Sequence, residues 1–293
     1  MRKQTTDDRR QTADDGRQNS ALCRLLSAVS QFDSALVAFS GGLDSSVVAK
    51  AAQLALGPKA LAVTAWSPSS CESEKQDAAK IAREIGIWHI VYESREFDDP
   101  AYLRNDKDRC YYCKKNRFTE MIRIAEEQNY QVVLDGSNAD DRFDYRPGTR
   151  AAQELGVRSP LAELGITKEV ARELAKSWNL SVWDKPAEPC LSTRIPYNQP
   201  LTEPLLRRIE TAESFLKTFC LSPLRVRVAD SATARIEVPV SQIEKLLEPH
   251  VRENLIEKFQ SLGFHAISVD LLGFRSGSMN KNEKALFRFR VDG

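Results

Sequence analysis

The sequence lacks the features of membrane-spanning and secreted disulfide-rich chains. Its longest apolar stretches are short and interrupted by charged residues, so no segment is expected to cross a membrane. The first 18 residues hold no apolar segment and do not resemble a secretory signal, which favours a cytoplasmic protein. Six scattered cysteines are too few for a secreted disulfide scaffold, so we expect them to be unbridged, catalytic or metal-bound.

The net charge is close to zero, and the sequence has few histidines. The 42 Lys and Arg residues nearly balance the 41 Asp and Glu residues, which leaves a net charge of +1 and disfavours binding of nucleic acid through bulk positive charge. The three histidines have no motif partners: His89, His250 and His265. With 293 residues, of which 42% are hydrophobic, the chain is long enough to bury a core without disulfides or a metal.

Strands and helices alternate in the first two thirds of the chain. Helical patterns at 45–56 and 72–85 separate the first three of four apolar runs. The runs predict strands at 34–39, 59–65, 87–92 and 131–134. This alternation predicts an α/β fold with a parallel sheet and helices on both faces, in which ligands bind beyond the carboxyl ends of the strands.

The pattern changes after about Tyr197. Two alternating segments, 224–228 and 234–238, are expected to pair as a hairpin, between helices at 203–219 and 241–260 and before a strand at 265–271. We therefore predict a small C-terminal α+β domain. The expected division is a disordered tail at 1–18, the parallel-sheet domain at 19–197 and the small domain at 198–293.

The sharpest local signal is a glycine turn between the first strand and the following helix, Ser40-Gly41-Gly42-Leu43-Asp44-Ser45. The glycines let the backbone approach phosphate oxygens, and the helix N-terminus offers N–H groups and a partial positive charge. Ser40 and Ser45 would add hydroxyl donors, and Asp44 would hold Mg²⁺ on the phosphates. The turn lacks the Lys-Ser pair of a Walker loop. The simpler alternative is a serine-capped turn.

A second polar segment follows the fourth strand and runs from Asp135 to Asp141. A parallel sheet would place it beside the glycine turn. Asp140 and Asp141 would then bind Mg²⁺, and Asn138 would orient nucleotide or substrate; an Asx-rich turn is the alternative.

Cys110 and Cys113 form a C-x-x-C pair within the basic segment KDRCYYCKKNRF, which favours thiolates. A structural zinc needs four ligands and no second pair follows, so Cys190 is the obvious third thiolate. Three thiolates suit a [4Fe–4S] cluster with one open iron, whereas ordinary clusters of this type use four. A redox dithiol with Cys190 as a separate nucleophile, or buried apolar cysteines, are the alternatives. The remaining cysteines lie in helical patterns and are expected to pack: Cys23, Cys71 and Cys220.

Five segments together resemble the LarE family of ATP-dependent sulfur transferases, in the PP-loop ATP pyrophosphatase superfamily: SGGLDS, RCYYCK, DGSNADDRFDYRPG, WDKPAEPCLSTRIPY and RSGSMN. The resemblance runs from about Leu22 to Arg290. It implies that ATP is cleaved between the α and β phosphates to adenylate pyridinium-3,5-biscarboxylic acid mononucleotide. The carboxylates become thiocarboxylates of a nickel-pincer cofactor, as in lactate racemase maturation.

The resemblance also implies residue roles. Cys190 stands where the family has its sulfur-donating cysteine. It would either give up its own sulfur or, with Cys110 and Cys113, hold a [4Fe–4S] cluster that carries a sulfide. The implied substrate residues are Arg194, Arg225 and Arg227, although an R-V-R strand is often only the solvated side of a sheet. Candidates for an acidic metal ligand are Glu210 and Glu213.

The implied partners are a sulfide donor, a downstream nickel-inserting protein and further copies of the chain in a trimer or hexamer, with neither membrane nor nucleic acid. One alternative is a PP-loop tRNA-thiolating enzyme, which would need extra C-x-x-C pairs or a basic RNA-binding domain. Another is a nucleotide-binding or iron–sulfur carrier, which would release no pyrophosphate with a pyridinium carboxylate.

Overall fold

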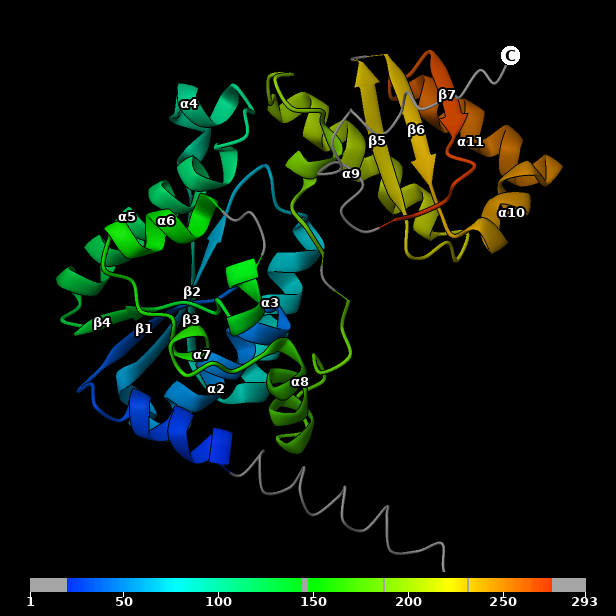
Figure 1. Cartoon of the computed structure of the whole chain (residues 1–293). Coiled ribbons are helices and arrows are strands. Elements are labelled where there is room, and N and C mark those ends of the chain that lie inside the picture. Colours follow the sequence, from blue (N-terminus) through cyan, green and yellow to red (C-terminus); the bar gives the residue numbers. More distant parts are fainter. Residues whose placement is uncertain (1–19, 144–146, 187, 231, 276–293) are drawn as a thin grey trace, which may run out of the picture. The chain divides into compact units, whose positions relative to one another are not determined.

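The computed structural model describes residues 20–143, 147–186, 188–230 and 232–275. The chain forms two compact units, Met1–Glu188 and Pro189–Gly293 (Figure 1). Cys190 and Arg194 therefore belong to the second unit, whereas composition places the domain boundary at 197–198. The division into domains stays a prediction. The expected tail at 1–18 and most of the RSGSMN segment lie outside the described residues.

A parallel four-stranded sheet forms the centre of the first unit, and each predicted apolar run contributes one strand. The sheet has the order β3-β2-β1-β4, and all three strand pairs are parallel. The strands are β1 (Ala35–Ala38), β2 (Ala60–Trp66), β3 (Trp88–Glu93) and β4 (Val132–Leu134). The predicted α/β class is confirmed.

Both faces of this sheet are covered because side chains alternate along each strand. In β1, Ala35 and Val37 pack with a helix at 20–29 and with α2, α3 and α8, whereas Leu36 packs with α5 on the other face. The helices of the first unit are α2 (Leu43–Leu56), α3 (Glu72–Ile85), α4 (Pro100–Leu103), α5 (Arg109–Glu127), α6 (Pro147–Glu154), α7 (Pro160–Glu163) and α8 (Lys168–Ser177).

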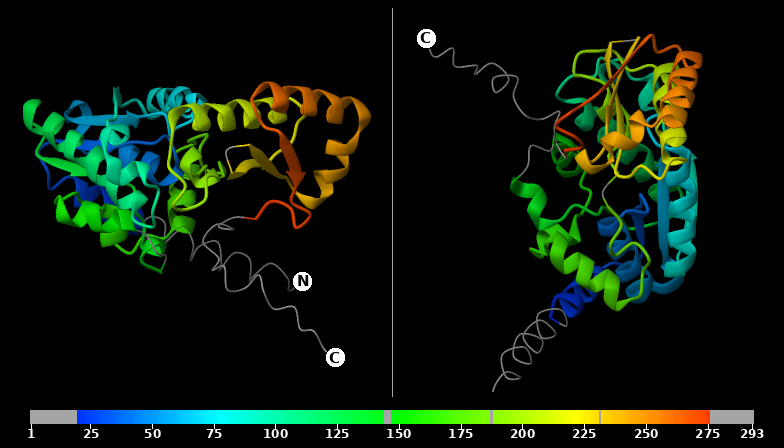
Figure 2. Two further views of the ribbon diagram at one scale, coloured as in Figure 1. Left: turned by 90° about the horizontal axis from the view of Figure 1, so that it is seen from above. Right: turned by 90° about the vertical axis from the view of Figure 1, so that its right-hand side faces the viewer.

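The second unit contains a three-stranded sheet of order β5-β6-β7. The predicted hairpin is present, with β5 (Arg225–Asp230) antiparallel to β6 (Thr233–Glu237), and β7 (Ala266–Val269) is parallel to β6. The helices α9 (Glu203–Lys217) and α11 (Pro249–Ser261) lie on one face of this sheet (Figure 2). The small α+β fold is thus confirmed.

The helix predicted at 241–260 is wrong in one respect, because it is interrupted. Helix α10 (Ile243–Leu247) ends before Glu248, and α11 begins at Pro249. Proline has no N–H to continue the hydrogen bonds of a preceding helix, but it fits the first position of a new one. Over the described ranges, every helix is too short or too polar to span a bilayer.

Candidate active site

The glycine turn lies at the carboxyl end of β1 and packs tightly against α3. Gly41 has φ +69°, and a β-carbon on it would lie 2.7 Å from Cα of Ala78. Only glycine satisfies both the left-handed backbone and this close approach. The glycine turn is therefore fixed against α3. Its backbone continues directly into the first turn of α2.

Two serine hydroxyls shape the turn from within. Ser40 Oγ and Ser45 Oγ lie 3.0 Å apart, the Gly42 amide donates to Ser40 Oγ, and Ser45 Oγ contacts the Gly42 carbonyl. Helix α2 begins at Leu43, and its N-cap Gly42 offers no side-chain acceptor to the first-turn amides. A helix N-terminus of this kind, with a glycine turn before it, suits an anionic phosphate.

The acidic segment after β4 lies directly against this turn. A β-carbon on Gly136 would be 2.6 Å from the Ser45 amide nitrogen. Asp135 before it is buried and accepts hydrogen bonds from the hydroxyls of Ser137 (2.7 Å) and Ser159 (2.6 Å). The structure thus brings two segments that are far apart in the sequence into one site, at the edge where a parallel sheet binds its ligands.

The other residues of this segment hold its conformation. Asn138 is buried and its Oδ1 accepts from the Asp140 amide (3.0 Å). Asp141 Oδ2 accepts from the Asn138 amide (3.2 Å), and Asp140 Oδ2 accepts from the Lys168 amide (2.9 Å). The segment therefore forms an Asx-type turn and also lies beside the glycine turn.

Sequence reasoning missed Lys168, the first residue of α8. Its Nζ lies 3.8 Å from Asp44 Oδ2, and both side chains are partly exposed. A carboxylate for Mg²⁺ and an ammonium group for phosphate oxygens therefore meet beside the N-terminus of α2. This donor set fits a Mg²⁺–nucleotide. In the sequence, Lys168 looked like an ordinary helix-start residue after Thr167, which caps α8.

The C-x-x-C pair lies on α5, one helical turn apart. Cys110 is exposed and Cys113 is half-buried. Their thiols are suitable ligands for iron, and the i, i+3 spacing places them on one side of the helix.

A buried charge cluster holds α5 at Arg117, one helical turn after Cys113. Sequence reasoning missed this cluster. Glu96 is fully buried, and its Oε1 accepts from Nη2 (2.7 Å) and Nε (3.2 Å) of Arg117. The Arg117 guanidinium also donates to Ser67 Oγ (3.2 Å), and Ser94 Oγ donates to Glu96. No local motif signals it, because its members come from α5 and from the segments after β2 and β3.

Electrostatics keep this cluster charged. Burial raises the pKa of Glu96, but Arg117 and the hydroxyls of Ser67 and Ser94 outweigh burial, so the pKa lies below its usual 4.5. Burial lowers the pKa of Arg117, whereas the charges of Cys113 and Glu96 raise it well above its usual value.

His89 is linked through Thr64 to Phe39, the residue before the glycine turn. Thr64 Oγ1 donates to the Phe39 carbonyl (2.7 Å) and lies 2.8 Å from His89 Nε2. Because the threonine proton is used on Phe39, His89 must donate from Nε2. Burial lowers the pKa of His89, which favours this neutral form.

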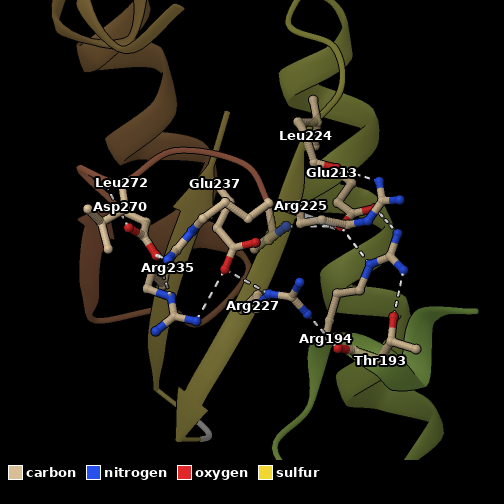
Figure 3. A network of polar contacts seen from close by, with 12 residues as sticks. Thr193, Arg194, Glu213, Leu224, Arg225, Arg227, Arg235, Glu237, Asp270 and Leu272 are labelled. Atoms are coloured by element: carbon tan, nitrogen blue, oxygen red, sulfur yellow. Dashed lines mark hydrogen bonds and ion pairs between the residues drawn. The ribbon is translucent and has the colours of Figure 1, made fainter. Parts of the chain in front are cut away.

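In the second unit, Cys190 precedes a short 3₁₀ helix, Leu191–Arg194. The Arg194 guanidinium is buried and contacts Glu213 Oε1 (2.9 Å) and Oε2 (3.0 Å). Figure 3 shows it between Glu213 and the turn that carries Thr193. The expected substrate residue Arg194 and the expected metal residue Glu213 therefore bind each other.

The two arginines of β5 differ in exposure. Arg227 is buried and donates to Glu237 Oε1 (2.8 Å) and to the Thr193 carbonyl (2.6 Å). Arg225 is half-buried, donates to the Leu224 carbonyl and lies 5.2 Å from the ring centre of Phe274. Arg225 is thus the more accessible of the two.

The acidic candidates are paired with arginines. Glu210 Oε2 accepts from Arg207 (2.7 Å). Glu237 was not predicted, yet its buried Oε2 has no hydrogen-bond partner within the described ranges. Across those ranges no three His, Cys, Asp or Glu residues form a metal-binding group. Cys110 and Cys113 lie in the first unit and Cys190 in the second, so the cysteine trio stays a prediction.

A parallel sheet whose first strand enters an SGGLDS turn defines an ATP-using protein of the PP-loop class. The NAD synthase family model matches residues 21–118, which include this turn and the C-x-x-C pair. The chain is 43% identical to the uncharacterised protein slr1717 of Synechocystis over 249 residues, or 85% of this chain and 92% of that one.

Two named proteins are also similar. The pyridinium-3,5-bisthiocarboxylic acid mononucleotide synthase of Lactiplantibacillus plantarum is 37% identical over 246 residues, 83% of this chain and 88% of that protein. The tRNA-specific 2-thiouridylase MnmA of Rickettsia africae is 28% identical over 190 residues, 52% of this chain and 51% of that protein. The chain belongs to the LarE family of ATP-dependent sulfurtransferases.

Proposed function

We propose that this chain adenylates the carboxylates of pyridinium-3,5-biscarboxylic acid mononucleotide and converts them to thiocarboxylates. The observation that carries the proposal is the assembly at the N-terminus of α2, where the Gly136 segment, Asp44 and Lys168 surround the glycine turn. The similarity to the L. plantarum synthase supports the choice of substrate.

The first step is adenylation. The amides that follow Gly41 and Gly42 hold phosphate oxygens, and Lys168 adds a positive charge. Asp44, with Asp140 and Asp141, would hold Mg²⁺, which neutralises the leaving pyrophosphate. Ser40 and Ser45 fix the turn, and Asn138 fixes the acidic segment beside it. A substrate carboxylate attacks the α phosphate, pyrophosphate leaves and an acyl-adenylate forms.

The second step replaces AMP by sulfur. A sulfur nucleophile attacks the acyl carbon, the bond to AMP breaks and a thiocarboxylate remains. In the sacrificial route, Cys190 forms a thioester; its Cβ–S bond then breaks as the Cα proton leaves, and dehydroalanine remains. In the alternative route, Cys110, Cys113 and Cys190 hold a [4Fe–4S] cluster, which would supply a bound sulfide from an external donor.

Substrate recognition is proposed for the second unit. Arg225, half-buried on β5, is positioned to bind an anionic group, and Arg227 beside it is fixed by Glu237. Glu210 is a candidate metal ligand in the same unit. A trimer or hexamer, a sulfide donor and a nickel-inserting protein that accepts the product complete the proposed setting.

The test is pyrophosphate release by the full chain with ATP and Mg²⁺. Release that requires the pyridinium dicarboxylate mononucleotide supports the proposal. Release without any acceptor, or none with this acceptor, contradicts it.

A tRNA-thiolating activity is the second candidate, and the similarity to the Rickettsia thiouridylase favours it. Its test is the same assay with unmodified tRNA in place of the mononucleotide. The near-neutral charge of the chain argues against it.

A further inference from the structure

Arg194 holds the backbone on both sides of Cys190. One nitrogen of its guanidinium, Nη1, donates to the Pro189 carbonyl (2.6 Å) and to the Cys190 carbonyl (3.1 Å). These carbonyls belong to the peptide groups before and after the Cys190 α-carbon. The Cys190 carbonyl also accepts from the amide and the hydroxyl of Thr193 (3.0 and 2.8 Å). Cys190 therefore sits in a turn whose shape depends on the Arg194 side chain.

The other edge of the same guanidinium is fixed by Glu213. Nε and Nη2 of Arg194 contact the two oxygens of Glu213 at 2.9 and 3.0 Å, and the two side chains are only 3% and 6% exposed. Glu213 Oε1 also accepts from the Val226 amide (2.9 Å). Glu213 lies on α9 and Val226 on β5, so the turn with Cys190 is connected to both elements (Figure 3).

Stability alone explains this arrangement poorly. A buried ion pair costs much of its Coulomb energy in desolvation, and well-packed apolar residues often replace such pairs without loss. A planar, bidentate Arg–carboxylate contact does, however, fix direction as well as distance. Sulfur transfer needs such fixation, because a misplacement of about 1 Å at a reacting group reduces rates by about a hundredfold.

We propose that Arg194 and Glu213 are positioning residues for Cys190. They act on sulfur delivery through the two peptide groups that flank it, and adenylation does not depend on them. This inference rests on the proposed function, in which Cys190 delivers the sulfur directly or as a ligand. It departs from the expected roles of Arg194 in substrate binding and of Glu213 in metal binding.

The test compares full-length Arg194→Lys and Glu213→Gln with the wild type. The first keeps the charge but loses the two-sided contact, and the second keeps the volume but loses the charge. Thr193→Val is a milder variant that removes the hydroxyl, which donates to the Cys190 carbonyl and accepts from Arg194 Nη1 (3.0 Å). Arg208→Lys is the matched control. Arg208 lies on α9, as Glu213 does, and it donates to a backbone carbonyl, that of Gly263 (2.7 Å), as Arg194 does to those of Pro189 and Cys190.

The first readout is the amount of pyrophosphate released per thiocarboxylate formed under anaerobic conditions. We expect this ratio to rise at least ~10-fold in Arg194→Lys and Glu213→Gln and less in Thr193→Val, while pyrophosphate release itself stays within ~2-fold of wild type. An unchanged ratio, or an equal fall of both products, overturns the inference.

The second readout is hydrogen exchange of the peptide that spans 189–194, which needs no substrate. We expect faster exchange in Arg194→Lys and Glu213→Gln than in Arg208→Lys. Unchanged exchange overturns the positioning role. A wild type that releases no pyrophosphate with the mononucleotide contradicts the proposed function instead, and the exchange experiment still decides the positioning role.

Discussion

The α-carbon of Gly136 approaches the glycine turn so closely that a β-carbon there would lie 2.6 Å from the Ser45 amide nitrogen. The other near atoms, Cα of Ser45 and the carbonyl carbon of Asp44, are also backbone, so no side chain can rotate away. The segment after β4 and the start of α2 are therefore fitted to each other at the site proposed for ATP.

Gly136→Ala is expected to displace the start of α2 and to weaken ATP binding. Loss of charge-assisted backbone contacts to phosphate typically costs about 1.5–3 kcal/mol, so KM for ATP should rise ~10- to 100-fold. The measurement is pyrophosphate release against ATP concentration. Gly165→Ala is the control: Gly165 has a positive φ, which Gly136 does not, but open space around it, so this substitution strains only its own backbone. Equal effects of the two variants would refute a specific contact.

Asp44→Asn is expected to abolish turnover and to leave the fold intact. The carboxylate is the proposed Mg²⁺ ligand, and asparagine keeps the size of this side chain, which is 22% exposed, so the packing around it is retained. Pyrophosphate release and a thermal melt are measured together. The exposed Asp98→Asn serves as the control. Full activity of Asp44→Asn, or loss of its fold, would contradict the assignment.

Because of the Glu96–Arg117 pair, the free energy of unfolding is expected to fall at acidic pH. Because the pKa of Glu96 is lowered on folding, its contribution is complete above the unfolded value near 4.5 and is lost as pH falls through the lower folded value. Urea unfolding between pH 3 and 7 should show this loss in wild type and a smaller loss in Glu96→Gln.

Arg117→Met should lower the free energy of unfolding by about 3–5 kcal/mol, because it leaves Glu96 buried without its partner. Arg123→Met on the same helix removes only exposed ion pairs and should change stability by less than ~1 kcal/mol. Equal effects of the two substitutions would show that the Glu96–Arg117 contact contributes no more than a surface pair.

Arg225→Ala is expected to weaken binding of the mononucleotide substrate more than binding of ATP. One charge-assisted contact accounts for roughly ten- to hundred-fold in affinity. Isothermal titration with each ligand measures the two dissociation constants. Unchanged substrate affinity would make Arg225 an ordinary residue of the sheet.

The strands and the glycine turn were predictable because each is encoded locally, by apolar runs and by SGGLDS. Side-chain periodicity alone predicted one continuous helix across Pro249, where the structure has a break. The proline itself signals this break in the sequence. Lys168, Glu96 and Arg117 were missed because their partners are remote in sequence. The Arg194–Glu213 contact shows the same limit: both residues were singled out, but the sequence did not show that they face each other.

Sulfur transfer itself is tested most directly by mass spectrometry of the nucleotide product and of the intact protein after anaerobic turnover. The reaction contains reconstituted full-length enzyme, ATP, Mg²⁺, the pyridinium dicarboxylate mononucleotide and excess sulfide. We predict a product in which sulfur has replaced carboxylate oxygen, formed in excess over enzyme, with Cys190 unchanged in mass. Loss of one hydrogen sulfide from Cys190 in step with product would establish the sacrificial route in place of the cluster. Pyrophosphate release without any sulfur-containing product would contradict sulfur transfer altogether.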